Sequence, residues 1–213
     1  MSAAPRARAA AALAALALAA AAVSGCGTLL GGDVPASTYF VWSDPGRSAP
    51  AAQPAPRSLL LAPTTTVAFS DTQRIVFSRA PGTRAYYQLA EWTERPGNRF
   101  DVLLLKRLEQ RNAFAQVSLL TSATRGDLML AATILDIYHD DARPPGLARL
   151  QISVELSDRN ARRLLARRTF VQEVAVREAN AADAVGAFNT AVGALLDELL
   201  PWLEAEAAKA ATR

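Results

Sequence analysis

Three consecutive segments of alternating side chains decide what this chain can fold into. Residues 127–140 are apolar on both alternating sets, residues 147–158 alternate apolar with polar side chains, and residues 164–176 alternate less regularly. A period of two residues is typical of β-strands, because successive side chains point to opposite faces of a sheet. The connections "DARPPG" and "RNAR" are short enough for antiparallel turns. The sequence therefore predicts an antiparallel meander whose first strand is central and covered on both sides over most of its length.

The inward positions of the meander and several shorter strands follow from the same pattern. The side chains expected to face the core are Leu150, Ile152, Val154, Leu156, Phe170, Val174 and Val176. Shorter apolar runs predict strands at 38–42, 58–63, 74–78, 85–90 and 114–120. Pro81-Gly82 indicates a hairpin between 74–78 and 85–90. The aromatic side chains near this hairpin, Tyr86, Tyr87 and Trp92, are expected to pack in the core or to form part of a partner surface.

Two helices are predicted from apolar residues at helical spacing. The first follows Pro96-Gly97, with Asn98 and Asp101 as a capping pair and an apolar stripe of Phe100, Leu103, Leu104 and Leu108. The second begins at the cap Asn180–Asp183 and carries Val185, Phe188, Val192, Leu195 and Leu199 on one face. Pro201 is expected to end or kink the second helix.

The N-terminal residues indicate a lipoprotein signal that ends at the chain's one cysteine. Arg6 and Arg8 precede a run of Ala, Leu and Val at 9–23, which suits a secretory signal and is shorter than a spanning helix. The segment "VSGC" (23–26) matches the bacterial lipobox, in which the thiol is acylated before cleavage. We therefore expect Cys26 to carry the lipid that anchors the mature chain to a membrane. An ordinary signal with a chance cysteine, or an uncleaved anchor, is the alternative interpretation.

These signals divide the chain into four parts. Residues 1–25 are expected to be the signal peptide, and 26–37 a lipidated tether that reaches no more than roughly 35–40 Å. One periplasmic domain is expected over 38–203. Inside this domain, residues 43–57 contain four prolines and no apolar residue larger than Ala. This composition predicts a surface loop that can be disordered. Residues 204–213 are expected to form a polar, frayed tail.

The net charge of the mature chain does not favour a nucleic-acid partner. Of the 23 Lys and Arg residues, Arg6 and Arg8 leave with the signal, so 21 basic residues remain against 20 acidic ones. A nearly neutral mature chain lacks the electrostatic footprint that polyanion binding requires. With its one cysteine acylated, the chain also has no thiol left for a disulfide.

Candidate catalytic and metal-binding residues are few. His139 is the chain's one histidine, at a predicted strand end beside Asp140 and Asp141. The sequence contains no G-x-S-x-G elbow, and a lone His at a strand end is usually solvated. One His and one acylated Cys are too few for a zinc site, although the two aspartates could weakly contact calcium. We therefore predict that the protein is not an enzyme and needs no cofactor or metal.

Five arginines cluster around the last predicted hairpin, and two interpretations of them stay open. They are Arg159, Arg162, Arg163, Arg167 and Arg168. One interpretation is a solvated turn and strand face. The other is a patch for an acidic partner surface or for lipid headgroups, since guanidinium groups match carboxylates and phosphates. Adjacent strand residues point to opposite faces, so Arg167 and Arg168 cannot join one patch. The candidate partner-binding residues are therefore Arg159, Arg162 and Arg163.

Several segments, taken in order, resemble the ABC-type transport auxiliary lipoproteins, the PqiC-like proteins encoded beside MCE lipid-transport systems. They are Cys26 followed by "STYFVW" (37–42), a central block at 61–110 with Trp92 ahead of a helix, "LMLAATILDIY" (128–138) and "AVGAFNTAVGAL" (184–195). The chain departs from the family's pattern in its long Pro/Ala segment and at Phe77-Ser78, where a Tyr-Arg pair is common.

The resemblance implies a fold, a function and partners. The implied fold class is α+β, a mixed, largely antiparallel β-sheet with two main helices packed mostly on one face. The implied function is a non-catalytic docking component of an ABC/MCE-type lipid transport system between membranes. Its implied partners are the membrane, reached through acylated Cys26, and an MCE-domain protein, with phospholipid and a second copy of the chain as further candidates. Because Gly27 follows the cysteine instead of the retention signal Asp, we expect the chain on the periplasmic face of the outer membrane.

Two functions of other classes remain as alternatives. One is a structural envelope lipoprotein that braces an outer-membrane assembly. The other is a hydrolase that acts on lipids, which would depend on His139 or on a serine. Genes for a permease, an ATPase and an MCE protein beside this one would favour transport, whereas an isolated gene would favour bracing.

Overall fold

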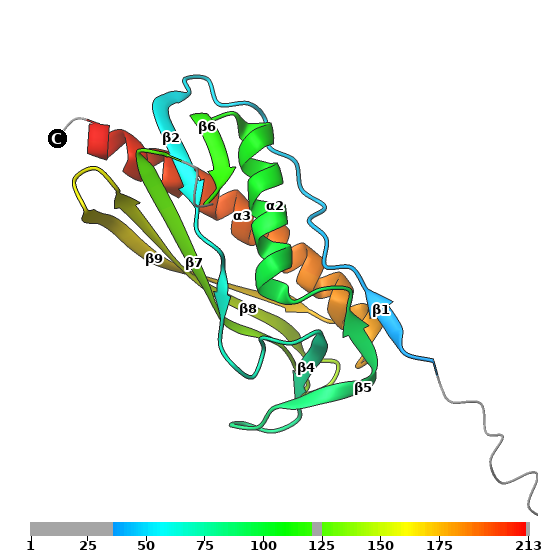
Figure 1. Ribbon diagram of the computed structural model, residues 1–213. Helices are drawn as coiled ribbons and strands as arrows, with labels where there is room; N and C mark the ends of the chain where they lie inside the picture. The colour runs from blue at the N-terminus through cyan, green and yellow to red at the C-terminus, as the bar shows by residue number, and fades with distance from the viewer. Residues whose placement is uncertain (1–35, 121–124, 212–213) are drawn as a thin grey trace, which may run out of the picture. The chain divides into compact units, whose positions relative to one another are not determined.

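Nine β-strands in one sheet and two helices make up the described residues, 36–120 and 125–211, of this computed structural model (Figure 1). In chain order they are β1 (Thr38–Phe40), β2 (Ala55–Leu61), β3 (Thr65–Thr66), β4 (Arg74–Ser78), β5 (Ala85–Trp92), α2 (Pro96–Arg111), β6 (Phe114–Leu119), β7 (Leu128–Asp140), β8 (Leu147–Asp158), β9 (Arg163–Ala175) and α3 (Ala181–Ala211). All of them belong to the compact unit that begins at Ser37.

The strands β7, β8 and β9 form the antiparallel meander that the sequence predicts. Both ladders run along nearly the full length of the strands, and each contains one irregularity, at Ile134/Asp136 and at Leu156/Ser157. Along β8, Leu150 and Val154 are fully buried while Gln151 between them is only half-buried. This alternation confirms the predicted inward and outward sets.

A second group of strands pairs with the other edge of β7. Here β2, β3 and β4 each run parallel to β7 over two or three residues. The strand β6 extends the sheet parallel to β2, while β5 pairs antiparallel with β4 and parallel with β1. The predicted hairpin around Pro81-Gly82 is therefore the β4–β5 pair, where Gly82 takes the left-handed φ of 74° that glycine favours. The sheet is mixed, with its longest ladders antiparallel.

Both helices pack on one face of this sheet, so the fold class is α+β as expected. The helix α3 lies against β8 and β9, and α2 lies against β6 and the middle of the domain (Figure 1). The predicted stripes are the buried faces: Phe100, Leu103, Leu104 and Leu108 in α2, and Val185, Phe188, Val192, Leu195 and Leu199 in α3. Burying each such side chain contributes about 1.5–3 kcal/mol, which makes these stripes the main source of the core's stability.

The opposite face of the meander is only partly covered, which corrects one prediction. We expected the segment 127–140 to be buried on both sides, because both of its alternating sets are apolar. In β7, Leu130 and Ile134 are buried toward the helices, but Met129 and Thr133 on the other face are half-buried. With both helices on one side, the described residues place no helix over the other face.

The two predicted helix caps have different outcomes. In α3, the Asp183 N–H donates to Asn180 Oδ1 at 2.8 Å, as the sequence predicts. In α2 the predicted Asn98–Asp101 pair is wrong, because the helix begins at Pro96 with no side-chain cap. The Asp101 carboxylate instead accepts the Thr64 backbone N–H at 3.1 Å and so ties the chain after β2 to α2. Burial raises the pKa of Asp101 above its ordinary value.

Two segments expected to be loose are ordered by packing. The segment 43–57 lacks regular structure as far as residue 54, but its Ala51 N–H donates to Arg111 O at 2.6 Å and its last three residues belong to β2. The tail expected to fray is helical as far as Ala211, and α3 continues past Pro201. The reason is that buried Leu203 and Ala207 extend the apolar face of the helix by two more turns.

Candidate functional site

The β8–β9 turn places the three predicted partner-binding arginines at one end of the meander. Arg159 and Arg162 lie in the turn, and Arg163 is the first residue of β9. The Arg159 N–H donates to Asp127 O at 2.9 Å, and Arg162 takes a left-handed φ of 51° that closes the turn. All three residues are exposed, as residues in or beside a turn at the end of a sheet are expected to be.

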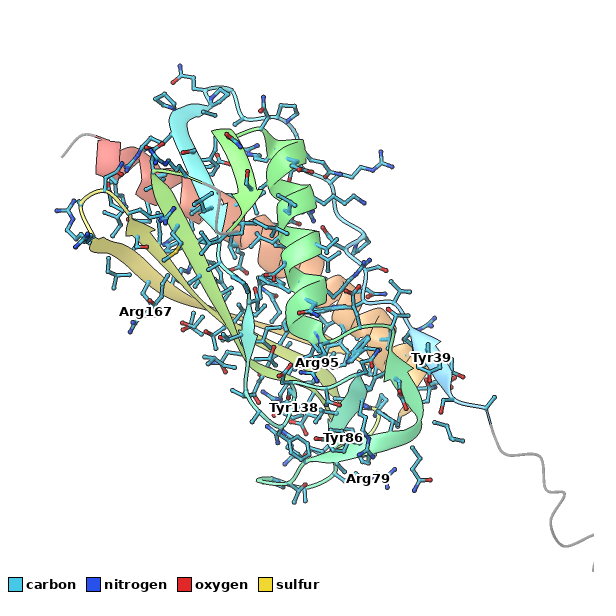
Figure 2. The ribbon with its side chains drawn as sticks, in the orientation of Figure 1. Tyr39, Arg79, Tyr86, Arg95, Tyr138 and Arg167 are labelled. Carbon is cyan, nitrogen blue, oxygen red and sulfur yellow. The ribbon has the colours of Figure 1, made fainter. Side chains whose placement is uncertain are left out.

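Within residues 36–120 and 125–211, these three arginines form no ion pair. Farther along β9, in contrast, Arg167 lies 2.6 Å from Glu155 and Arg168 lies 3.6 Å from Glu198 of α3. The Arg168 guanidinium also lies 4.6 Å above the Phe170 ring, on the helix side. Arg167 projects outward from β9 (Figure 2), so the two adjacent residues point to opposite faces as predicted. Within the β8–β9 hairpin, as far as the structure describes it, the arginines without an ion pair are therefore those of the turn.

Hydrogen bonds and one ion pair hold the base of the turn. Asp158 accepts the Ala161 N–H at 2.9 Å and pairs with Arg57 of β2 at 2.6 Å. These bonds lower the pKa of Asp158, the Ala161 N–H most strongly. Asp127 accepts the backbone N–H and hydroxyl of Ser58 at 2.9 and 2.8 Å, which lowers the pKa of that carboxyl as well. Among the described residues, neither carboxylate forms an ion pair with the arginines of the turn.

A shallow hollow of about 310 Å³ opens beside the turn. Its lining residues are Met129, Ser157, Asp158, Arg159, Arg162, Arg163 and Leu164. Leu164 is 49% exposed, which is unusual for a leucine in a strand. The hollow therefore combines cationic groups with apolar surface, the composition of a protein-binding surface rather than of a deep ligand pocket.

His139 is not solvated, contrary to the sequence-based expectation. The imidazole is fully buried between β5 and the β7–β8 turn. Its Nε2 lies 2.7 Å from Pro145 O, and its Nδ1 lies 2.7 Å from the Tyr87 hydroxyl. Because a carbonyl oxygen only accepts, Nε2 carries a proton and donates it to Pro145 O. Burial, together with the charge of Asp141, raises the pKa of Tyr87 to about 12.

The two aspartates beside His139 form ion pairs with nearby arginines. Asp140 accepts from Arg149 Nε at 2.8 Å, and Asp141 Oδ2 lies 3.6 Å from Arg79 Nε. No group of three or more His, Cys, Asp or Glu side chains in the described part of the chain is arranged to hold a metal ion. The geometry thus assigns Asp140 and Asp141 to ion pairs.

The three aromatic residues near the hairpin have different environments. Trp92 is 3% exposed, and its ring lies 5.8 Å from that of Phe188. Tyr87 contacts His139, as described above. Tyr86 is nearer the surface, with its ring stacked 4.5 Å from Phe69 (Figure 2). Trp92 is therefore a core residue, whereas Tyr86 and Tyr87 are both half-buried.

Sequence reasoning missed a buried cluster around Arg107. Its guanidinium, 1% exposed, bonds both carboxylate oxygens of Asp44 and also Ser48 and Asp197. Gly46 permits this approach, since a Cβ there would lie 1.6 Å from Arg107 Nη2. Arg107 thus ties the segment 43–57 to both helices. No local pattern in the sequence points to this cluster, because its members are 63 and 90 positions apart from Arg107.

The predicted lipid attachment site, Cys26, lies outside the described residues. Among the helices that are described, neither is long and apolar enough to cross a membrane.

Comparisons with known proteins agree with this architecture. The sequence profile of a family described as "ABC-type transport auxiliary lipoprotein component" matches residues 42–199. A Xanthomonas campestris protein of the DUF330 family has a similar crystal structure, with 21% identity, a TM-score of 0.74, and coverage of 83% of this chain and 100% of that one. A crystal structure of an uncharacterised protein gives 10% identity, a TM-score of 0.62, and coverage of 79% and 99%. No curated protein matches.

The fold and the turn define a class of protein: an α+β domain with helices on one face of its sheet and a cationic turn at the sheet's end. Because the family profile covers well over half of the sequence, the chain belongs to the ABC-type transport auxiliary lipoprotein components. Its role is therefore auxiliary to a transport system.

Proposed function

We propose that this chain is an outer-membrane-tethered, periplasmic docking component of an ABC/MCE-type lipid transport system, without catalytic function of its own. The family match over 42–199 supports the auxiliary role. The observation that carries the docking role is the β8–β9 turn, with three exposed arginines that have no ion-pair partner in the described residues.

The position of the turn supports the same conclusion. Thr38, the first residue of β1, follows the proposed tether, and β1 lies at the opposite end of the Ser37–Arg213 unit from the β8–β9 turn (Figure 1). The 31-residue helix α3 runs between these ends and spans about 46 Å. A lipid on Cys26 would hold the β1 end near the membrane, so the turn would be presented to a partner in the periplasm.

The decisive experiment is capture of an MCE-domain protein from the same organism. The acylated chain, in mild detergent, is compared with R162E/R163E at low and high salt. We expect the charge reversal to weaken capture, and more strongly at low salt, because exposed charges are screened beyond about 10 Å at 0.1 M salt. The matched control is R47E/R143E, which reverses two exposed arginines elsewhere and should capture normally. Equal capture by the wild type and R162E/R163E at both salt concentrations would contradict the docking role of the turn.

The anchor has a separate test. Cys26→Ser should abolish incorporation of a radioactive fatty acid and leave a longer, unprocessed precursor. Wild-type chain should sediment with outer-membrane markers in a density gradient. Incorporation that persists in the variant, or sedimentation with inner-membrane markers, would refute the proposed anchor or its location respectively.

A further inference from the structure

The outer edge of β9 presents unpaired backbone groups over most of its length. In the described chain, β9 pairs only with β8. The Val176 N–H donates to Gly146 O at 3.0 Å, directly beyond the pair Leu147–Ala175, so 146 and 176 form a hydrogen-bonded pair of the antiparallel ladder. Hydrogen-bonded and non-hydrogen-bonded pairs alternate in such a ladder. The residues whose N–H and C=O point away from β8 are therefore Arg167, Thr169, Val171 and Glu173.

The side chains at these positions do not protect the edge. All four are exposed on the face away from the helices, since buried Phe170 between them packs against Trp202 of α3. Natural sheets often block such edges with charged side chains. Here, however, Arg167 is held by Glu155 and Glu173 by Arg149, both on the neighbouring β8. Their charges lie over the sheet and leave the backbone of the edge accessible.

The edge ends beside the unpaired arginines of the turn. The regular β8–β9 ladder covers Ala166 to Ala175, which is ten residues or about 33 Å. At its Ala166 end it is interrupted by the irregularity opposite Leu156/Ser157. A strand added along the edge would run directly toward Arg163 and Arg162 at this end. In the middle of the edge, Thr169 and Val171 would favour β-branched neighbours, because such cross-strand pairs stabilise a sheet.

We propose that β9 binds an extended, acidic segment of the docking partner by strand addition, with backbone bonds to the edge and carboxylates against the turn arginines. This inference rests on the proposed function and adds the mode of binding. Charge complementarity selects this occupant over a second copy of the chain. If two copies paired antiparallel through β9, the basic turn of each copy would lie beside Arg177 and Glu178 of the other copy. The charges of these two residues cancel, so the pair would offer the turn arginines no net acidic surface.

Backbone hydrogen exchange of the acylated full chain, measured residue by residue in detergent, tests the edge directly. In the chain alone, the amides of 167, 169, 171 and 173 should exchange at least tenfold faster than those of 168, 170, 172 and 174. Adding the MCE-domain protein should slow the first set to the rate of the second. Unchanged exchange of the amides of 167, 169, 171 and 173 with the partner bound would overturn the proposal. It would also be overturned if, without partner, these amides became more protected as the concentration of the chain itself increased.

A pair of variants separates backbone from side-chain effects. Val171→Pro removes an N–H that makes no bond to β8, whereas Val171→Thr keeps both the N–H and a β-branched side chain. We expect at least tenfold weaker capture for V171P and normal capture for V171T. If the wild type captures the partner and V171P captures it equally, strand addition is wrong and the docking function stands. If the wild type captures none, the docking function itself fails. The exchange pattern decides the matter even if V171P does not fold.

Discussion

Replacing Arg107 by methionine should remove the cluster that joins the segment 43–57 to both helices. Methionine matches the length of the aliphatic part of arginine but forms none of the bonds to Asp44, Ser48 and Asp197. The Asp44 carboxylate, 7% exposed, would then keep only the Gly46 N–H at 2.8 Å as a partner. Breaking a buried pair on one side typically costs about 3–5 kcal/mol, because the remaining charge stays buried.

Chemical denaturation of the domain from Ser37 to Arg213 measures this cost. For a domain of this size, a loss of 3–5 kcal/mol lowers the melting temperature by roughly 6–20 °C. The double variant R107M/D44N should recover part of the loss, since it removes the stranded charge. Asp197→Asn is the matched control: its side chain is 63% exposed, so its removal should cost less than about 1 kcal/mol. Proteolysis at Arg47 should be faster in R107M than in the control.

The reasoning about Arg107 would be refuted by a loss below about 1 kcal/mol in R107M. It would also be refuted if R107M and D197N lost equal stability. Either result would mean that packing of Trp42, whose indole N–H donates to Phe188 O at 3.1 Å, orders the start of the segment without help from the ion pair.

The core and the half-buried Tyr87 give two further predictions. Leu104→Ala and Phe188→Ala should each destabilise the domain by about 2–5 kcal/mol through lost burial and the remaining cavity, while Val102→Ala, at a site 46% exposed, should shift stability by less than about 0.5 kcal/mol in thermal melts. Because the folded state raises the pKa of Tyr87 to about 12, stability that is complete below pH 10 should fall as the pH rises from 10 to 12. Urea titrations should show that this decline is reduced in Tyr87→Phe, and an unchanged decline would contradict the assignment.

Local patterns explain how much of the fold could be predicted. The meander follows from side chains that alternate with period two, and both helix faces follow from apolar residues three or four apart, as at Leu104 and Leu108. These patterns report which face of an element is buried. The exposure of the turn at Arg162 could be predicted for the same reason, because a short link between two antiparallel strands must lie at the end of the sheet.

The contacts that sequence reasoning missed join residues far apart in the chain. Arg107 meets Asp44 and Asp197 across 63 and 90 positions, and no local pattern encodes that meeting. The burial of His139 likewise depends on Tyr87, 52 positions earlier. The free edge of β9 was missed because its recognition needs the order of strands in the sheet, which alternation alone cannot supply.

The base of the basic turn should lose stability in acid. The Ala161 N–H, Arg57 and the Ser58 N–H hold the pKa values of Asp158 and Asp127 below the ordinary aspartate value. Stability from such groups is complete above that ordinary value, about 4, and is lost as the pH falls through the lower folded-state pKa values. At pH 7, Asp158→Asn should cost about 1.5–3 kcal/mol, the usual contribution of hydrogen bonds to a charged group. Urea unfolding should show the wild type and D158N converging as the pH falls through the lowered pKa of Asp158, because the wild-type carboxyl is then protonated too. A constant difference in unfolding free energy between the wild type and D158N from pH 7 to pH 2 would mean that the ionised Asp158 carboxylate does not hold the turn. The orientation of the turn would then depend on Asp127 and the backbone alone.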